Sequence, residues 1–171
     1  MLDDTDNKLS NGNYALTVII AEEMATANLR DIFTHLQPES HPSVEFLVCT
    51  GRDRSMLDGV PDRKNVRIIR AHADSRIPLL WRDGIRAAQA DKVALTTAHC
   101  VPPQSWIKQL LAYPLEGKQV AVGGAIENVE NDTTVGRVIY LLRYVRYTKS
   151  RPNGRVDDLA ADNALYRKAD I

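Results

Sequence analysis

Charged and hydroxyl side chains stand directly after four runs of apolar residues in this sequence. The apolar runs are residues 14–20, 44–49, 65–70 and 92–96. The polar side chains that follow them are, in chain order, Glu22 and Glu23, Thr50 to Asp53, Asp74 with Arg76, and Thr97 with His99. If the four runs are parallel strands of one sheet, these side chains meet at the carboxyl edge and form a binding crevice.

Several common nucleotide-binding and catalytic motifs are absent from the sequence. Residues 21–28 read AEEMATAN and lack the glycines with which a Rossmann turn approaches a pyrophosphate. No phosphate-binding P-loop occurs, and no G-x-S-x-G turn follows a strand. His99 and Cys100 are adjacent, so on a strand end they point in opposite directions and cannot pair as base and nucleophile. We expect Cys100 to be a small packed residue.

The positions of apolar residues predict the elements that carry these side chains. Helical spacing follows the first, third and fourth apolar runs, over residues 26–36, 77–88 and 103–113, and residues 119–126 form a fifth strand. Thr26 can cap the first of these helices, and Pro78 suits the first turn of the second. Alternation of apolar strands with helices predicts a single α/β domain, with a mainly parallel twisted sheet and helices on both faces.

Residues 132–149 are predicted to form the longest helix, and it has two apolar faces. Aliphatic side chains form one stripe, and Tyr140, Tyr144 and Tyr147 form a second. Basic residues interrupt both stripes. The simplest interpretation is a helix packed between core and solvent with its arginines extended to water. A membrane surface or a second subunit could cover the second face instead.

Composition narrows the classes of function and the compartment. The chain has 22 basic and 22 acidic residues, so it offers no general charge excess for binding nucleic acid. Its two cysteines are too few for a disulfide scaffold, which favours a reducing, cytoplasmic setting. Residues 1–13 are polar, resemble no signal peptide, and are expected to be a disordered tail before a domain over residues 14–171. No apolar stretch is long enough to cross a bilayer.

The order of segments resembles the nucleotide-binding part of family 2 glycosyltransferases, which have the GT-A fold. The resemblance covers nearly all of the chain after residue 13. Its clearest pieces are Gly84 and Ala88 in one helix, the loop VALTTAHCVPPQSW with Pro102 and Trp106, and residues 163–167. This last segment reads NALYR and is similar to the family's N-x-A-[FY]-R segment.

The resemblance implies that a nucleoside diphosphate-sugar lies across the strand ends, with Mn²⁺ or Mg²⁺ bridging its diphosphate. It implies base contacts after the first two strands and places Arg76 and Arg82 toward the diphosphate. The residues assigned in this way to nucleotide binding are Ala21, Glu22, Glu23, Thr50, Asp53, Arg76, Arg82 and Thr97. Each has a plainer alternative: the two glutamates as acids near a helix N-terminus, Asp53 as a partner of neighbouring arginines, and both arginines as surface charges.

The sequence departs from the family where its D-x-D metal motif would follow the fourth strand. The chain reads Thr96, Thr97, Ala98 and His99 there, without a carboxylate. Hydroxyls are neutral ligands, and a histidine such as His99 suits softer metals than Mg²⁺, so His99 is at most a weak metal candidate. Asp157 and Asp158 could be a relocated site, although adjacent acids before an apolar run are more typical of a solvated loop.

Two functions remain open at this stage. The first is transfer of a sugar from a nucleotide donor with inversion, with Arg76, Arg82 or His99 in the role of the carboxylate-held metal. The second is a non-catalytic module that acts by binding a protein partner. We also expect self-association or attachment to a second subunit, and the chain could contact the inner face of the membrane. The family's catalytic carboxylate lies beyond the N-x-A-[FY]-R segment, so we expect this chain to be incomplete at its C-terminal end.

Overall fold

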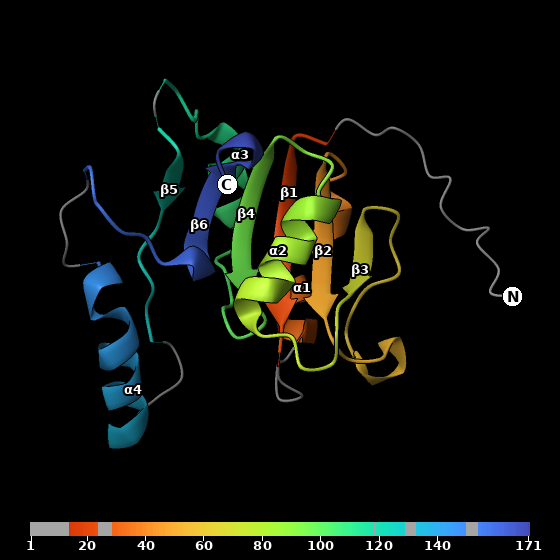
Figure 1. The fold of residues 1–171 in the computed structure, drawn as a ribbon, viewed down its shortest axis with the longest axis horizontal. Helices are drawn as coiled ribbons and strands as arrows, with labels where there is room; N and C mark the ends of the chain where they lie inside the picture. Colours follow the sequence, from red (N-terminus) through yellow and green to blue (C-terminus); the bar gives the residue numbers. More distant parts are fainter. Residues whose placement is uncertain (1–13, 24–28, 118, 129–132, 150–153) are drawn as a thin grey trace, which may run out of the picture.

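The computed structural model describes residues 14–23, 29–117, 119–128, 133–149 and 154–171. Within them, six strands form one sheet in the order β3-β2-β1-β4-β6-β5 (Figure 1). The strands are β1 (Leu16–Glu22), β2 (Val44–Thr50), β3 (Val66–Arg70), β4 (Lys92–Thr97), β5 (Ala121–Gly123) and β6 (Ala164–Arg167). β1 to β4 are mutually parallel, whereas β6 runs antiparallel to both β4 and β5. The predicted α/β class with a mainly parallel sheet is confirmed.

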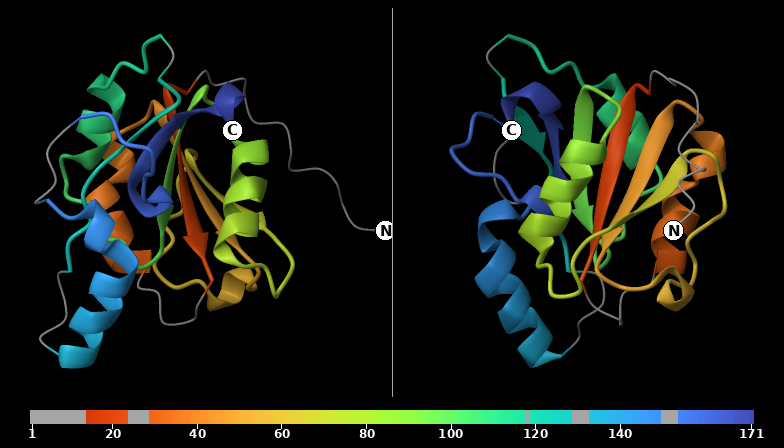
Figure 2. Two further views of the ribbon diagram at one scale, coloured as in Figure 1. Left: turned by 60° about the vertical axis from the view of Figure 1, so that its left-hand side comes forward. Right: turned by 45° about the vertical axis from the view of Figure 1, so that its right-hand side comes forward.

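Helices cover both faces of the sheet, as the double-sided apolar pattern of its strands requires. α1 (Leu29–Leu36) and α3 (Trp106–Ala112) pack on one face, and α2 (Ile77–Ala87) packs on the other (Figure 2). Successive side chains of β1 point to opposite faces of the sheet and so contribute to both hydrophobic cores. Val18 and Ile20 belong to the core beneath α1 and α3, while Ile19 contacts the core beneath α2.

The C-terminal part of the sheet differs from the prediction. The fifth strand spans only Ala121–Gly123 instead of residues 119–126, and the NALYR segment contributes an additional strand, β6. β6 inserts between β4 and β5, where Leu165 is fully buried. Four residues are too few for a clear alternation of apolar and polar positions, so periodicity alone could not reveal this strand. The predicted tail over residues 1–13 and the Thr26 cap lie outside the described residues.

α4 (Thr134–Tyr144) stands beside the sheet rather than on it (Figures 1 and 2). It has 11 residues, as α2 has, so these two are the longest α-helices among the described residues, and Val145–Tyr147 continue α4 as a 3₁₀ turn. The interpretation of a helix packed against the core is wrong, because no residue of α4 is buried. Its aliphatic stripe faces solvent: Leu142 is 81% and Val135 is 70% exposed.

The tyrosine face of α4 attaches this helix to the rest of the molecule. The Tyr140 hydroxyl donates to the Ile126 carbonyl at 2.6 Å, and the Tyr144 hydroxyl donates to the Asp162 carboxylate at 2.8 Å. Of the two apolar faces predicted from the sequence, the aromatic one therefore makes the internal contacts. Within the described residues, no helix combines the length and apolarity needed to cross a bilayer.

A buried acid ties the strands together near the amino end of the sheet. Glu45 of β2 has no exposed surface and accepts hydrogen bonds from the Thr17 hydroxyl at 2.8 Å and the Gln89 backbone N–H at 2.9 Å. The Arg67 guanidinium, on β3, pairs with its other oxygen. One carboxylate thus connects three neighbouring strands and the segment that leads into β4.

Candidate functional site

The carboxyl ends of β1 and β2 are joined by a buried acid. Glu22, the last residue of β1, has a fully buried side chain. Its two carboxylate oxygens accept hydrogen bonds from the Thr50 hydroxyl and from the Arg52 guanidinium, the latter at 2.8 Å. The register pairs Glu22 with Thr50 directly across the two strands. These contacts satisfy both oxygens and cross-link the two strand ends.

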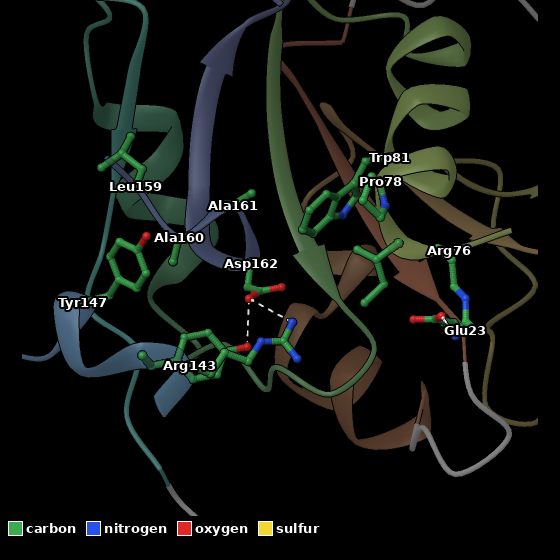
Figure 3. A pocket seen from close by; sticks show the side chains of 12 residues that line it. Glu23, Arg76, Pro78, Trp81, Arg143, Tyr147, Leu159, Ala160, Ala161 and Asp162 are labelled. Carbon is green, nitrogen blue, oxygen red and sulfur yellow. Dashed lines mark hydrogen bonds and ion pairs between the residues drawn. The ribbon is translucent and has the colours of Figure 1, made fainter. Parts of the chain in front are cut away.

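A cavity of about 510 Å³ opens next to this edge, on the side of β4 and β6 (Figure 3). Glu23, which follows β1, and Arg76, which precedes α2, lie on one side of it. The Arg76 guanidinium and the Glu23 carboxylate form an ion pair at 2.7 Å. The opposite side carries Arg143 and Asp162 (Figure 3). Trp81 of α2 lies between them, and its indole N–H donates to the Thr96 carbonyl at 2.9 Å. An open cavity of this size can accommodate part of a small organic ligand.

Asp162 is the buried acid of this cavity. Its side chain is 8% exposed, and its Oδ2 atom accepts from the Tyr144 hydroxyl at 2.8 Å, with an Arg143 guanidinium nitrogen 3.7 Å away. Its Oδ1 atom is buried and has no hydrogen-bond partner among the described residues. Burial, and next the neighbouring Asp162 carboxylate, raise the pKa of Tyr144, so the phenol remains a hydrogen-bond donor at neutral pH.

Asn163 anchors the 3₁₀ turn Ala161–Asn163, which also contains Asp162. The Asn163 side chain accepts from the Trp106 indole N–H at 2.8 Å and donates to the Ala125 carbonyl at 3.1 Å. Its backbone carbonyl accepts from the Gly124 N–H. The asparagine of the NALYR segment therefore acts as a structural anchor that links α3, β6 and the segment after β5.

The residues at the end of β4 do not fit a Mg²⁺ or Mn²⁺ site. Thr97 is buried and directs its hydroxyl to the Cys100 sulfur at 3.4 Å, while His99 is exposed. Across the part of the chain that the structure describes, no three His, Cys, Asp or Glu side chains lie together as possible metal ligands. Asp157 and Asp158 lie in an exposed loop, and Asp158 accepts from the Tyr147 hydroxyl. Hard divalent cations need several oxygen ligands, which this arrangement does not supply.

The structure brings together some of the nucleotide-binding residues predicted from the sequence. Glu23 and Arg76 form one side of the cavity, whereas Glu22 and Thr50 are fully buried, hydrogen-bond to each other and do not line it. The remaining residues have other surroundings. Ala21 is buried in the core, Asp53 pairs with Arg70, Thr97 is buried, and Arg82 pairs with Asp83 beside a second, more apolar cavity. Arg76 and Arg82 therefore line different cavities, which are adjacent and share Pro78 and Trp81.

Most residues that line the cavity were not among the predicted site residues, and the charged and hydrogen-bonding group Arg143, Tyr144 and Asp162 is the most important omission. The tyrosine spacing had identified a second face of α4, but it could not show that this face meets the loop before β6. Asp162 precedes the asparagine of the NALYR segment, so its position next to a structural anchor was the available signal. Its burial depends on α4 and could not be read from the sequence.

Comparison of the sequence with known protein families identifies one family. A model of the family described as Glycosyl transferase family 2 matches residues 50–171, well over half of the chain. The match includes β2's last residue, α2, β4 and the whole C-terminal side of the cavity. No curated protein matches the chain. The sheet order, the cavity at the strand ends and the family match agree, and the chain belongs to glycosyl transferase family 2.

Proposed function

We propose that this chain binds a nucleoside diphosphate-sugar in the cavity between α2, α4 and the loop before β6, as the donor side of a glycosyl transfer reaction. The observation that carries the proposal is that cationic and hydrogen-bond-accepting side chains line the same cavity. Arg76 and Arg143 lie on opposite sides of the cavity. The Asp162 carboxylate, one oxygen of which has no hydrogen-bond partner among the described residues, lies on the same side as Arg143. A diphosphate needs cationic partners, and a sugar needs hydrogen-bond acceptors.

The guanidinium groups support diphosphate binding without a bridging metal ion. Arg76 is 82% exposed and Arg143 is 56% exposed, so both can turn toward a ligand. Guanidinium groups bind phosphate oxygens in a bidentate manner and keep their charge at every physiological pH. In this proposal they offset the negative charge that develops on the nucleoside diphosphate as the bond to the sugar carbon breaks.

Binding of nucleotides in the presence of EDTA tests this function. We expect calorimetric titration with UDP, GDP, UDP-glucose and GDP-mannose to show binding of at least one diphosphate that persists without free divalent cations. Arg76→Ala and Arg143→Ala should each weaken it by about tenfold, the loss expected for one charged contact of about 1.4 kcal/mol. Arg63→Ala, at an exposed position outside the cavity, is the matched control. Binding by none of these nucleotides contradicts the proposal.

A second candidate is a non-catalytic module of the same family that acts through a protein partner or a second copy. The observation that favours it is the exposed aliphatic stripe of α4, together with the missing carboxylates after β4. Such a module would bind a nucleotide, or a protein, without turnover. Incubation with radiolabelled sugar nucleotides separates the two candidates, because only an enzyme releases free nucleoside diphosphate, by transfer or by slow hydrolysis.

A further inference from the structure

The unpartnered oxygen of Asp162 distinguishes this carboxylate from every other buried acid among the described residues. Glu22 and Glu45 are as deeply buried, but both oxygens of each accept hydrogen bonds. Oδ1 of Asp162 is the one buried side-chain polar atom of the described chain without a partner. Buried polar atoms are almost always hydrogen-bonded, because desolvation without a partner is costly. Asp162 lines the adjoining cavity, so a rotation of its carboxylate would bring Oδ1 to a hydrogen-bond donor of a ligand there.

The surroundings of Asp162 select the class of that ligand. A guanidinium nitrogen of Arg143 lies 3.7 Å from the carboxylate, and its positive charge disfavours a metal ion there. The described residues also contain no group of three His, Cys, Asp or Glu side chains that could bind one. Apart from Glu23 and Arg76 on the far side, the other lining residues are aromatic or aliphatic, with Trp81 and Tyr147 among them. The indole N–H of Trp81 is already engaged, so this side chain presents its ring to the cavity. A carboxylate beside aromatic rings suits a neutral ligand with hydroxyl donors and C–H faces.

We propose that Asp162 binds hydroxyl groups of the transferred sugar and sets the preference of the site among sugars. The inference rests on the proposed function, since it assigns the sugar end of the same nucleotide-sugar. Tyr144 is a positioning residue: its hydroxyl occupies Oδ2 and leaves Oδ1 to the ligand. The Arg143 guanidinium lies 5.1 Å from the Tyr144 ring centre, so it helps to hold this tyrosine in place.

The test compares the affinity for each nucleotide-sugar with that for its own nucleoside diphosphate, in wild type, Asp162→Asn and Asp157→Asn. Asp157 is an exposed acid of the preceding loop and provides the matched control. We expect Asp162→Asn to weaken nucleotide-sugar binding by tenfold or more, to leave the bare diphosphate within twofold, and to change the ranking of UDP-glucose, UDP-galactose and UDP-N-acetylglucosamine. Asp157→Asn should match the wild type.

The outcomes separate the two proposals. If wild type binds no nucleoside diphosphate, the proposed function fails, and the inference fails with it. If the diphosphate binds but Asp162→Asn leaves every nucleotide-sugar affinity unchanged, only the inference is overturned, and an ordered water then satisfies Oδ1. Tyr144→Phe provides a second variant in case Asp162→Asn does not fold. It should change the ranking of sugars while leaving diphosphate affinity within twofold, and an unchanged ranking would count against the inference.

Discussion

Buried carboxylates at the two ends of the sheet are stabilised by partners from neighbouring strands. Glu45 near the amino end and Glu22 at the carboxyl end each combine a threonine hydroxyl with an arginine. A charged group removed from water needs such partners, because the desolvation penalty otherwise exceeds what the fold can supply. The arginine partner of each acid is partly buried, so removal of the carboxylate leaves a partly buried cation without its counter-charge.

Glu45→Ala should therefore destabilise the protein strongly. The substitution leaves the Thr17 hydroxyl, the Arg67 guanidinium and the Gln89 N–H without their acceptor. We expect the free energy of unfolding to fall by about 3 to 5 kcal/mol, as when one partner of a buried ion pair is removed. Urea denaturation followed by circular dichroism measures this loss. Glu39→Ala, at an exposed position, should stay within about 0.5 kcal/mol of the wild type.

Burial of Cys49 makes the free energy of unfolding depend on pH at alkaline values. Burial, and next the charge of Asp83, raise the pKa of Cys49 to about 12. The folded protein then holds this proton more tightly than the unfolded chain, so the associated stability is complete below the ordinary thiol pKa and is lost as pH rises toward 12. Between pH 7 and pH 10, wild type should lose about 1 to 2 kcal/mol more stability than Cys49→Ala. Equal losses in urea titrations at the two pH values would contradict this assignment.

The packing of α2 on the sheet depends on a close approach of backbone to side chains. Gly84 is buried in α2, and a Cβ atom there would lie 2.4 Å from the Cγ2 atom of Ile19 and 2.8 Å from the Cys49 sulfur. Such distances are far inside van der Waals contact, so the helix can lie this close to β1 and β2 only with glycine at this position. The same helix presents Trp81 to the cavity, which makes its distance from the sheet relevant to the site.

Gly84→Ala tests this contact. In an exposed helix the change stabilises by up to about 1 kcal/mol, because alanine has the higher helix propensity. Here we expect a net loss of about 1 to 3 kcal/mol, since overpacking of a well-packed core displaces the helix. Thermal and urea unfolding check the sign, and a stabilised variant would show that α2 has room to move. Because the strain is shared with Ile19, a weaker effect is expected in the Ile19→Ala background.

At the scale of the whole molecule, a rigid α/β layer is combined with a helix attached at its edge. The sheet has a core on each face, whereas α4 contacts the remainder through its tyrosines and leaves its aliphatic stripe exposed. The cavity lies where these parts meet, so its geometry depends on the hydrogen bonds of Tyr140 and Tyr144.

Substitutions in these two parts should therefore have very different effects. Leu142→Ser, at a side chain that is 81% exposed, should change the free energy of unfolding by less than about 0.5 kcal/mol. Ile107→Ala, at a side chain that is 1% exposed, should lower it by about 2 to 5 kcal/mol. Urea denaturation of both variants checks the contrast. A large loss for Leu142→Ser would show that another chain or segment covers α4 in solution.

The sequence by itself determined the α/β class, four parallel strands close to their observed bounds, and a polar edge at the carboxyl ends. These features follow from local periodicity, because burial on two faces imposes apolar runs and each helix needs one apolar stripe. The family resemblance through residues 163–167 also followed from local sequence.

Tertiary structure alone decided which polar residues share the cavity. Arg76 and Arg82 are only six residues apart, yet they lie beside different cavities, because Arg76 precedes α2 with extended backbone and Arg82 lies within the helix. Asp162 and Tyr144 meet across 18 residues of chain, and no local pattern reports such a pairing. Local periodicity specifies which face of an element is buried, whereas the contacts that build a site depend on how separate elements pack.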